Sequence, residues 1–403
     1  MLKRIVYLVF FFAFISSELL IAKNKYPIIL VHGFMGWGRE EMGNYRYWGG
    51  KVDLEKHLKE KGYTVFTANI GPISSNWDRA VELYYQIKGG QVDYGNAHSE
   101  LFGLIQKPKR KKNPGLYPEW SEENPVHLVG HSLGGQTVRM LDYLLKTSIL
   151  DSLEKKEESD LLGESHEGWI SSITSISTPH NGTTLSDIVT TSIPFLQDFI
   201  AVGAVVGSSF YSFDLEQWGF SRADDETWGN YFRRMIDQKL WGTKNIVAWD
   251  VSVEGAKQMN TLCEANPDVY YFSFVTSNTK IDSASKRHVP DNSMSFILRA
   301  NARLMGAKKA FYADGTATDS TWFENDGIVN KTSMFGPTTG TNGPDPIAIY
   351  REDELLIPGQ WYVMGEFQSD HRKFIGHSLK ESELDSMKAV FTKHMALLWT
   401  LSE

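Results

Sequence analysis

A continuous apolar segment that runs directly into a glycine-bounded turn constrains the fold of this chain more than any other feature. Val126–Gly130 (VHLVG) has the length and composition of a strand that is buried on both faces, as in a parallel sheet. The turn 130–134 (GHSLG) follows without a break, and Gln136–Lys146 then has the apolar spacing of a helix. A strand, a tight turn and a helix in this order predict an α/β protein.

Other segments alternate in the same way. Pro27–Val31 predicts a buried strand, Lys51–Lys61 a helix with one apolar stripe, and Tyr63–Ala68 a further strand, which together form a βαβ unit. Ile170–Ile176 and Tyr270–Val275 predict two more strands. We therefore expect a mostly parallel central sheet flanked by helices.

Composition excludes some classes of site and partner. The chain has 41 basic and 49 acidic residues, a net charge of −8 that argues against a nucleic-acid partner. Cys263 is the only cysteine, so an internal disulfide and a Cys-rich metal site are excluded. The basic run Lys107–Lys112 is interpreted as a solvated loop, with docking to an anionic surface as the alternative.

The N-terminus has the order of a secretory signal. Lys3 and Arg4 precede an apolar run, Ile5–Ile15, and small residues follow. We predict a signal peptide over residues 1–22 and a secreted or periplasmic protein whose remaining residues, 23–403, form a single domain. An uncleaved membrane anchor is the alternative, although the apolar run is short for a membrane span.

The glycine-bounded turn also predicts chemistry. A serine between a strand and a helix in G-x-S-x-G occupies a strained turn that presents its hydroxyl as a nucleophile, here Ser132. Acyl transfer further needs two N–H donors for the oxyanion. One is the N–H of Leu133, directly after the nucleophile, and the other is the N–H of Phe34, at the end of the strand Pro27–Val31.

At this point the chain resembles the bacterial lipases of the Geobacillus–Staphylococcus type. The similarity extends from about residue 27 to about residue 375 in one order. The resemblance implies an α/β-hydrolase fold with lid and aromatic or metal-site insertions, and hydrolysis of triacylglycerols and other carboxylic esters at a lipid–water interface. The matching motifs are 32–34 (HGF), 36–42 (GWGREEM), 47–50 (YWGG), 74–80 (SSNWDRA), 92–95 (VDYG), 130–137 (GHSLGGQT), 178–184 (TPHNGTT) and 324–330 (ENDGIVN).

The acid and the base follow the nucleophile in this fold, in that order. Of the downstream histidines, His394 falls in the helix-like stretch Glu381–Leu398 and is interpreted as a structural or surface residue, whereas His371 follows a polar loop. The resemblance also selects His371 as the base and Asp326 as the acid. We predict that Ser132, Asp326 and His371 form a catalytic triad.

The resemblance implies a structural zinc site with two aspartates and two histidines. Asp78, His98 and Asp250 match three of the ligands, but Leu104 stands at the fourth. Structural zinc sites normally have four protein ligands, and this set has three. A water molecule, or Glu100 as a substitute, would have to supply the fourth. A polar cluster without metal is the alternative.

The resemblance also implies a calcium site near the catalytic histidine, and here the chain departs further. Lys373 stands where the family has a glutamate, and Ser378 and Leu379 replace an Asp-Pro pair. Since calcium prefers several oxygen ligands including carboxylates, we expect no calcium. The loop that carries His371 then needs another anchor, which the sequence does not reveal.

A lid is expected at about residues 185–215, because Ile188–Phe213 is apolar on most faces and follows the Thr-Pro-His motif as the family's lid does. A buried core helix is the alternative. The sequence thus predicts a secreted serine lipase or carboxylesterase that needs no cofactor for its chemistry. The alternatives are a phospholipase A1 or an acyltransferase with the same triad, and a non-catalytic lipid binder.

Overall fold

The computed structural model describes residues 24–109, 111–150, 155–186, 216–219, 223, 225–227, 230 and 243–402. The predicted signal peptide, residues 1–22, lies outside the described residues. Of the predicted lid, about residues 185–215, only residues 185–186 are described. Within the described residues, no helix has the length and apolar character needed to cross a membrane.

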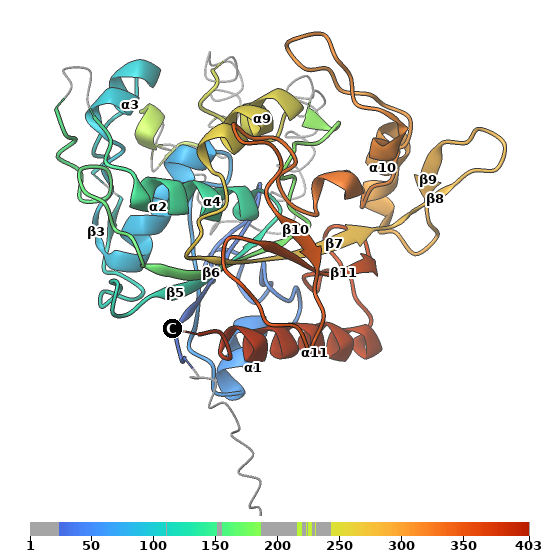
Figure 1. Ribbon diagram of the computed structural model, residues 1–403, viewed down its shortest axis with the longest axis horizontal. Coiled ribbons are helices and arrows are strands. Elements are labelled where there is room, and N and C mark those ends of the chain that lie inside the picture. Colours follow the sequence, from blue (N-terminus) through green and yellow to red (C-terminus); the bar gives the residue numbers. More distant parts are fainter. Residues whose placement is uncertain are drawn as a thin grey trace, which may run out of the picture.

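A seven-stranded sheet, in which every neighbouring pair is parallel, forms the centre of the molecule (Figure 1). The strand order is β10-β11-β7-β6-β5-β1-β2. The central strands β1, β5 and β6 are buried almost throughout, as expected for a parallel sheet covered by helices. The strands are β1 (Ile28–Val31), β2 (Val65–Thr67), β5 (Val126–His131), β6 (Ile170–Ile176), β7 (Tyr270–Ser277), β10 (Ile347–Ile349) and β11 (Trp361–Gln368).

Helices cover both faces of this sheet (Figure 1). On one face lie α2 (Asn76–Lys88), α4 (Leu133–Lys146) and α9 (Val253–Leu262), and on the other lie α1 (Leu54–Glu60) and α11 (Glu381–Leu398). Each face has its own apolar core: Val138 and Leu141 of α4 belong to one, whereas Leu54 of α1 and Phe391 of α11 belong to the other. This arrangement confirms the predicted α/β-hydrolase class of fold.

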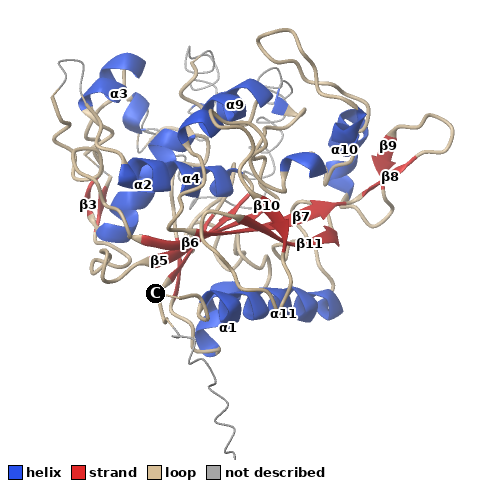
Figure 2. Cartoon of the chain, in the orientation of Figure 1, coloured by secondary structure: helices blue, strands red, loops and turns tan. Residues whose placement is uncertain are grey.

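The remaining elements lie outside the sheet, as Figure 2 shows. This set consists of two short antiparallel ribbons, β3–β4 and β8–β9, and several short helices. They are β3 (Gly90–Gln91), α3 (Asn96–Phe102), β4 (Lys112–Asn113), η1 (Glu216–Trp218), α8 (Val247–Asp250), β8 (Thr279–Ile281), β9 (His288–Pro290), η3 (Phe296–Leu298), α10 (Arg299–Met305), η4 (Ser320–Phe323) and η5 (Lys331–Ser333).

The interpretation of the basic run as a solvated loop is wrong at Lys111. Its side chain is buried, and its Nζ lies 2.6 Å from Oε1 of Glu82 and 3.0 Å from the hydroxyl of Tyr94. The other carboxylate oxygen of Glu82 accepts a hydrogen bond from the backbone N–H of Gly71. A buried ammonium needs such a partner, and here it supports the loop that follows β2.

Candidate active site

Ser132 occupies the turn between β5 and α4. Its backbone has φ 58° and ψ −129°, a conformation that costs free energy for a residue other than glycine and that is expected for a nucleophile in this turn. The Ser132 N–H donates to the carbonyl of Ile176, 2.8 Å away, which holds the turn against β6.

A second segment packs directly against this serine. A Cβ placed on Gly33 would lie 2.6 Å from the Cβ of Ser132 and 3.1 Å from its Oγ, so only glycine permits the approach. Ser132 is only 6% exposed, whereas the sequence predicted a turn that presents its hydroxyl. The packing of Gly33 also places the segment that contains Phe34 beside the nucleophile.

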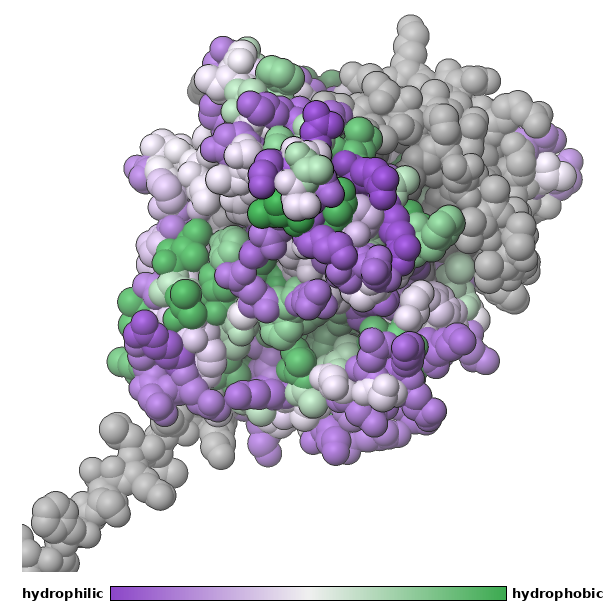
Figure 3. Space-filling view, turned by 90° about the vertical axis from the view of Figure 1, so that its right-hand side faces the viewer, coloured by the Kyte–Doolittle hydropathy of each residue, from purple (hydrophilic) through white to green (hydrophobic). Residues whose placement is uncertain are grey.

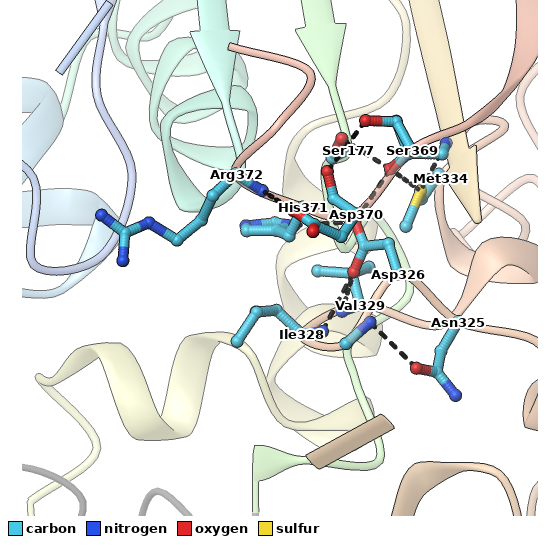
Figure 4. A network of polar contacts seen from close by, with 12 residues as sticks. Ser177, Asn325, Asp326, Ile328, Val329, Met334, Ser369, Asp370, His371 and Arg372 are labelled. Atoms are coloured by element: carbon cyan, nitrogen blue, oxygen red, sulfur yellow. Dashed lines mark hydrogen bonds and ion pairs between the residues drawn. The ribbon is translucent and has the colours of Figure 1, made fainter. Parts of the chain in front are cut away.

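Asp326 and His371 are in direct contact, as predicted from their order in the chain. The Nδ1 of His371 lies 2.8 Å from Oδ2 of Asp326, and the His371 N–H donates to the Asp326 carbonyl at 3.1 Å. Figure 4 shows the two residues arriving from different loops. Because Nδ1 carries the hydrogen that the carboxylate accepts, the lone pair of the imidazole is on Nε2, as a general base requires.

The carboxylate of Asp326 is fixed on every side and has no exposed surface. Its Oδ1 accepts the backbone N–H groups of Ile328 and Val329, at 3.0 and 2.8 Å (Figure 4). Its Oδ2 accepts the hydroxyl of Thr276 at 2.8 Å in addition to His371. Since Thr276 donates its single hydrogen to Asp326, the hydroxyl of Ser177, 2.7 Å from it, is the donor in that second contact.

A buried chain of hydrogen bonds joins the three segments of the site. The N–H of Gly33 donates to the hydroxyl of Tyr47 at 2.8 Å, so Tyr47 must direct its own hydrogen to Nδ1 of His131, 2.6 Å away. His131 then carries its hydrogen on Nε2, which donates to the His371 carbonyl at 3.0 Å. Burial lowers the pKa of His131 well below its usual value, in agreement with this neutral form.

The end of β1 is held by a buried arginine. Arg79 has no exposed surface, and its guanidinium donates to the carbonyls of His32 and Gly71 and to the hydroxyl of Thr137. These bonds connect the segment next to Phe34 with α4, whose first residue is Leu133. Within the described residues, neither the Phe34 N–H nor the Leu133 N–H donates to a protein acceptor, so both are available to an oxyanion.

The other downstream histidines have structural partners. His394 lies in α11, as expected for a structural residue, and its Nε2 is 2.7 Å from the hydroxyl of Thr174. His377 donates from Nε2 to the Tyr47 carbonyl at 2.8 Å. Burial lowers the pKa of both imidazoles to about 3.

The three matched zinc ligands do not form a metal site as they are arranged. The Asp78 carboxylate accepts from Nε2 of His98 at 2.8 Å and from the amide of Asn245 at 3.0 Å, while Asp250 accepts the backbone N–H of Asn76. Glu100, the suggested substitute, is exposed. In the described part of the chain, no group of three or more histidine, cysteine or carboxylate residues is placed to hold a metal ion. These residues are joined to their neighbours by hydrogen bonds, and Leu104 leaves the set without a fourth protein ligand.

The calcium ligands are also missing from the loop after His371. The Nζ of Lys373 lies 2.6 Å from the carbonyl oxygen of Ser293, where a bound cation would need that oxygen and carboxylates beside it. The donor set does not fit calcium.

Several residues of the site were not identified from the sequence. Tyr47, Arg79, His131 and Thr276 form the hydrogen bonds described above, and the carboxylate of Asp370, next to His371, accepts the backbone N–H groups of Arg372 and Lys373. Four of them lie next to a predicted site residue or inside a matching motif, which was the available signal. Thr276 had none, because a threonine near the end of an apolar strand is common.

Comparisons with known proteins agree with this geometry. Residues 24–391 match the family model described as "Lipase-like, C-terminal domain". The lipase of Staphylococcus hyicus is 33% identical over 385 residues, which is 93% of this chain and 56% of that protein. The chain thus spans little more than half the length of this curated relative.

Two solved structures cover most of both chains. The structure of EstA from Clostridium botulinum is 39% identical with a TM-score of 0.88, and it matches over 96% of this chain and 90% of that chain. Lipase 1 from Pelosinus fermentans is 37% identical with a TM-score of 0.79, over 93% and 99%. With its parallel sheet, serine turn and paired acid and base, this chain belongs to the lipase-like family of α/β-hydrolases.

Proposed function

We propose that this protein is a serine hydrolase of carboxylic esters, with Ser132, His371 and Asp326 as its triad. The observation that carries the proposal is the pairing of His371 with a fully buried Asp326, beside the strained turn that holds Ser132. His131, which precedes Ser132, bonds to the His371 backbone, so the turn and the base belong to adjoining segments.

The geometry supports an acyl-enzyme mechanism. The Nε2 of His371 takes the proton from Oγ of Ser132 as Oγ bonds to the ester carbonyl carbon. Asp326 keeps the imidazole in the required tautomer and stabilises its protonated form. The N–H groups of Phe34 and Leu133 bind the oxyanion, each contributing about 10²- to 10³-fold in rate.

The second half of the cycle uses the same groups. The tetrahedral intermediate collapses, the bond to the alcohol breaks, and the proton on Nε2 of His371 goes to the leaving alcohol. A water molecule then gives its proton to Nε2 and bonds to the acyl carbon, and Ser132 leaves with that proton as the carboxylic acid is released.

As substrates we propose triacylglycerols and other carboxylic esters presented at a lipid–water interface. The similarity to proteins named lipase and EstA supports this class of substrate. Exposed apolar side chains offer a second support: Phe296 is 85% exposed and Ile297 62% exposed. Figure 3 shows the side of the molecule to which η3 and α10 belong, where apolar groups lie among polar ones.

We further propose that the protein is exported, on the basis of the N-terminal charge and apolar run. Mass spectrometry of the N-terminus of the protein recovered from culture medium, periplasm and cells tests this. A mature N-terminus near residue 23 outside the cytoplasm is expected, and an intact N-terminus in the membrane fraction would contradict it.

The experiment that tests the function is hydrolysis of p-nitrophenyl esters from C2 to C18, together with labelling by a fluorophosphonate probe. The wild-type protein should react with both, and Ser132→Ala should react with neither. A long-chain optimum would support a lipase. Activity on phospholipids alone would favour a phospholipase A1, and acyl transfer to an added alcohol would favour an acyltransferase. The absence of probe labelling would favour a non-catalytic lipid binder.

A further inference from the structure

We propose that the segment carrying the catalytic base, residues 370–377, is held by a metal-free clamp in which Asp370 and Lys373 tie it to the turn 293–295. The two side chains are positioning residues that fix His371. The inference rests on the proposed function only in that His371 is taken as the base. The hydrogen bonds of Asp370 and Lys373 do not depend on that role.

Asp370, directly before the base, forms the inner half of the clamp. Its carboxylate has no exposed surface and accepts four hydrogen bonds. Oδ2 accepts the backbone N–H and the hydroxyl of Ser295, at 2.8 and 2.6 Å. Oδ1 accepts the backbone N–H groups of Arg372 and Lys373, at 3.1 and 3.0 Å. One carboxylate thus closes the turn after His371 and attaches it to a distant loop.

Lys373 forms the outer half. Its ammonium donates to the carbonyl oxygen of Ser293 at 2.6 Å, two residues before the contact of Ser295 with Asp370. In the described part of the chain Lys373 has no ion pair, so a carbonyl oxygen is its partner. A bound cation could link this segment to the Ser293 carbonyl oxygen in the same way. Here the ammonium of Lys373 supplies that positive charge.

The turn 293–295 is itself rigidly held. The carboxylate of Asp291 accepts both the N–H and the hydroxyl of Ser293, each at 2.9 Å. Arg299 donates from Nε to the carbonyl of Met294 at 3.0 Å. A fixed partner is required if the clamp is to restrict the movement of His371.

The far end of the segment is pinned separately. The Gly49 N–H donates to the Ile375 carbonyl at 2.8 Å, and His377 donates to the Tyr47 carbonyl. The hydroxyl of Tyr47 in turn bonds to His131. With both ends held, the clamp decides how precisely the imidazole between them faces Ser132.

The experiment compares the wild-type protein with Lys373→Met, which removes the ammonium and keeps the apolar stem, and with Lys373→Arg, which restores a cationic donor. Lys388→Met is the matched control, because Lys388 forms an ion pair with the exposed Asp385 on α11, outside the clamp. Each protein is assayed for kcat and KM with p-nitrophenyl butyrate, in EDTA and in calcium chloride at constant ionic strength. Hydrogen exchange of residues 370–377 is measured on the same samples.

We expect Lys373→Met to lower kcat about five-fold with KM within about two-fold, and to speed hydrogen exchange in the segment. Lys373→Arg should recover most of both losses, and Lys388→Met should match the wild type. Wild-type activity and exchange should be the same in EDTA and in calcium. Should Lys373→Met fail to fold, Ser295→Ala, which removes one donor to Asp370, should show the same pattern.

Two results would overturn the proposal. One is wild-type exchange in the segment that slows on addition of calcium, which would mean that a metal holds the loop. The other is a Lys373→Met protein with unchanged kcat and exchange. Hydrogen exchange does not depend on catalysis, so a wild-type protein inactive on every ester would count against the proposed function and leave the test of the clamp intact.

Discussion

The Nε2 of His131 lies 3.0 Å from the backbone carbonyl oxygen of His371, and the centroids of the two imidazole rings are 4.6 Å apart. His131, the residue next to Ser132, therefore holds the main chain of His371. Tyr47 extends this contact to Gly33, beside the predicted oxyanion donor Phe34. Three loops that arrive from distant parts of the chain are joined by one line of hydrogen bonds.

Replacing Tyr47 by Phe should reduce turnover. The substitution leaves the Gly33 N–H and Nδ1 of His131 buried without partners, at a cost of about 1–3 kcal/mol for each group. We expect kcat for p-nitrophenyl butyrate to fall roughly ten-fold with little change in KM. Tyr63→Phe is the control, because the ring of Tyr63 makes an edge-on contact with Trp399 and not with the residues of this chain of hydrogen bonds. Equal kcat values for the two variants would contradict the role of the chain.

Replacing Asp326 by Asn should nearly abolish activity. The amide favours the wrong imidazole tautomer, and a loss of about 10⁴-fold in kcat is expected for such a change. Thr276→Val, which removes one donor to the same carboxylate, should cost about ten-fold. The measurement is single-turnover ester hydrolysis, with Asp319→Asn at an exposed helix cap as the control. An Asp326→Asn protein that retains a tenth of wild-type activity would refute the assignment of the acid.

Exposed apolar residues should contribute to adsorption on lipid and not to chemistry. We expect the double variant Phe296→Ser and Ile297→Ser to bind triolein emulsions about ten-fold more weakly, because two large apolar side chains lose their transfer from water. Hydrolysis of soluble p-nitrophenyl acetate should stay within about two-fold. Leu355→Ser is the matched control, since Leu355 is exposed in a different loop. If Leu355→Ser weakened emulsion binding as much as the double variant, Phe296 and Ile297 would not form a specific lipid-binding surface.

Stability should decline in mild acid because of buried neutral histidines. Burial lowers the pKa of His32, His127, His377 and His394 to about 3. The unfolded chain binds protons at these positions below about pH 6.5, so the stability that they contribute is complete above that pH and is lost as the pH falls toward 3. Each adds about 1.4 kcal/mol per pH unit to the slope of the unfolding free energy.

Urea denaturation between pH 7.5 and 5, a range that spans the ordinary histidine pKa, measures this slope. His127→Gln removes one of these buried imidazoles and should therefore reduce the slope by the contribution of one proton. A stability that is independent of pH over this range would show that these imidazoles are protonated in the folded protein.

Removal of metal should have little effect on this protein. With Asp78 bonded to His98 and Asn245, we expect less than about 0.1 zinc per chain after dialysis against EDTA and a melting temperature within about 1 °C on adding zinc. Leu104→His, which supplies the family's missing ligand, should bind zinc and raise the melting temperature. One zinc per wild-type chain after gel filtration would reverse the interpretation.

The sequence was most informative where burial and motif coincide. The strand Ile170–Ile176 and the helix Glu381–Leu398 have the predicted bounds, and the turn at Ser132 lies where its glycines placed it. In β11 only the first three residues are fully buried, and Gly365 and Glu366 interrupt the pattern, so this strand was not predicted. Apolar periodicity detects strands that are buried throughout and misses those that leave the core.

Long-range contacts account for the rest of what was missed. The carboxylate of Asp370 bonds to Ser295, 75 residues away, and Nζ of Lys373 bonds to the carbonyl of Ser293, 80 residues away. A lysine at the family's glutamate position suggested an altered loop, but the partner of that lysine is a backbone oxygen, which no side-chain pattern reports. The anchor of the base loop therefore became visible only in three dimensions.

The sheet order has a consequence for the timing of assembly. Strand β11 leads to the base and lies between β10 and β7, so it is among the last parts of the sheet to be made. His131 and His371 are 240 residues apart. At about 5–20 residues per second, the ribosome needs roughly 12–48 s to progress from one to the other. During that interval the nascent chain contains Ser132 but not yet His371, so the hydrogen bond between His131 and His371 cannot form.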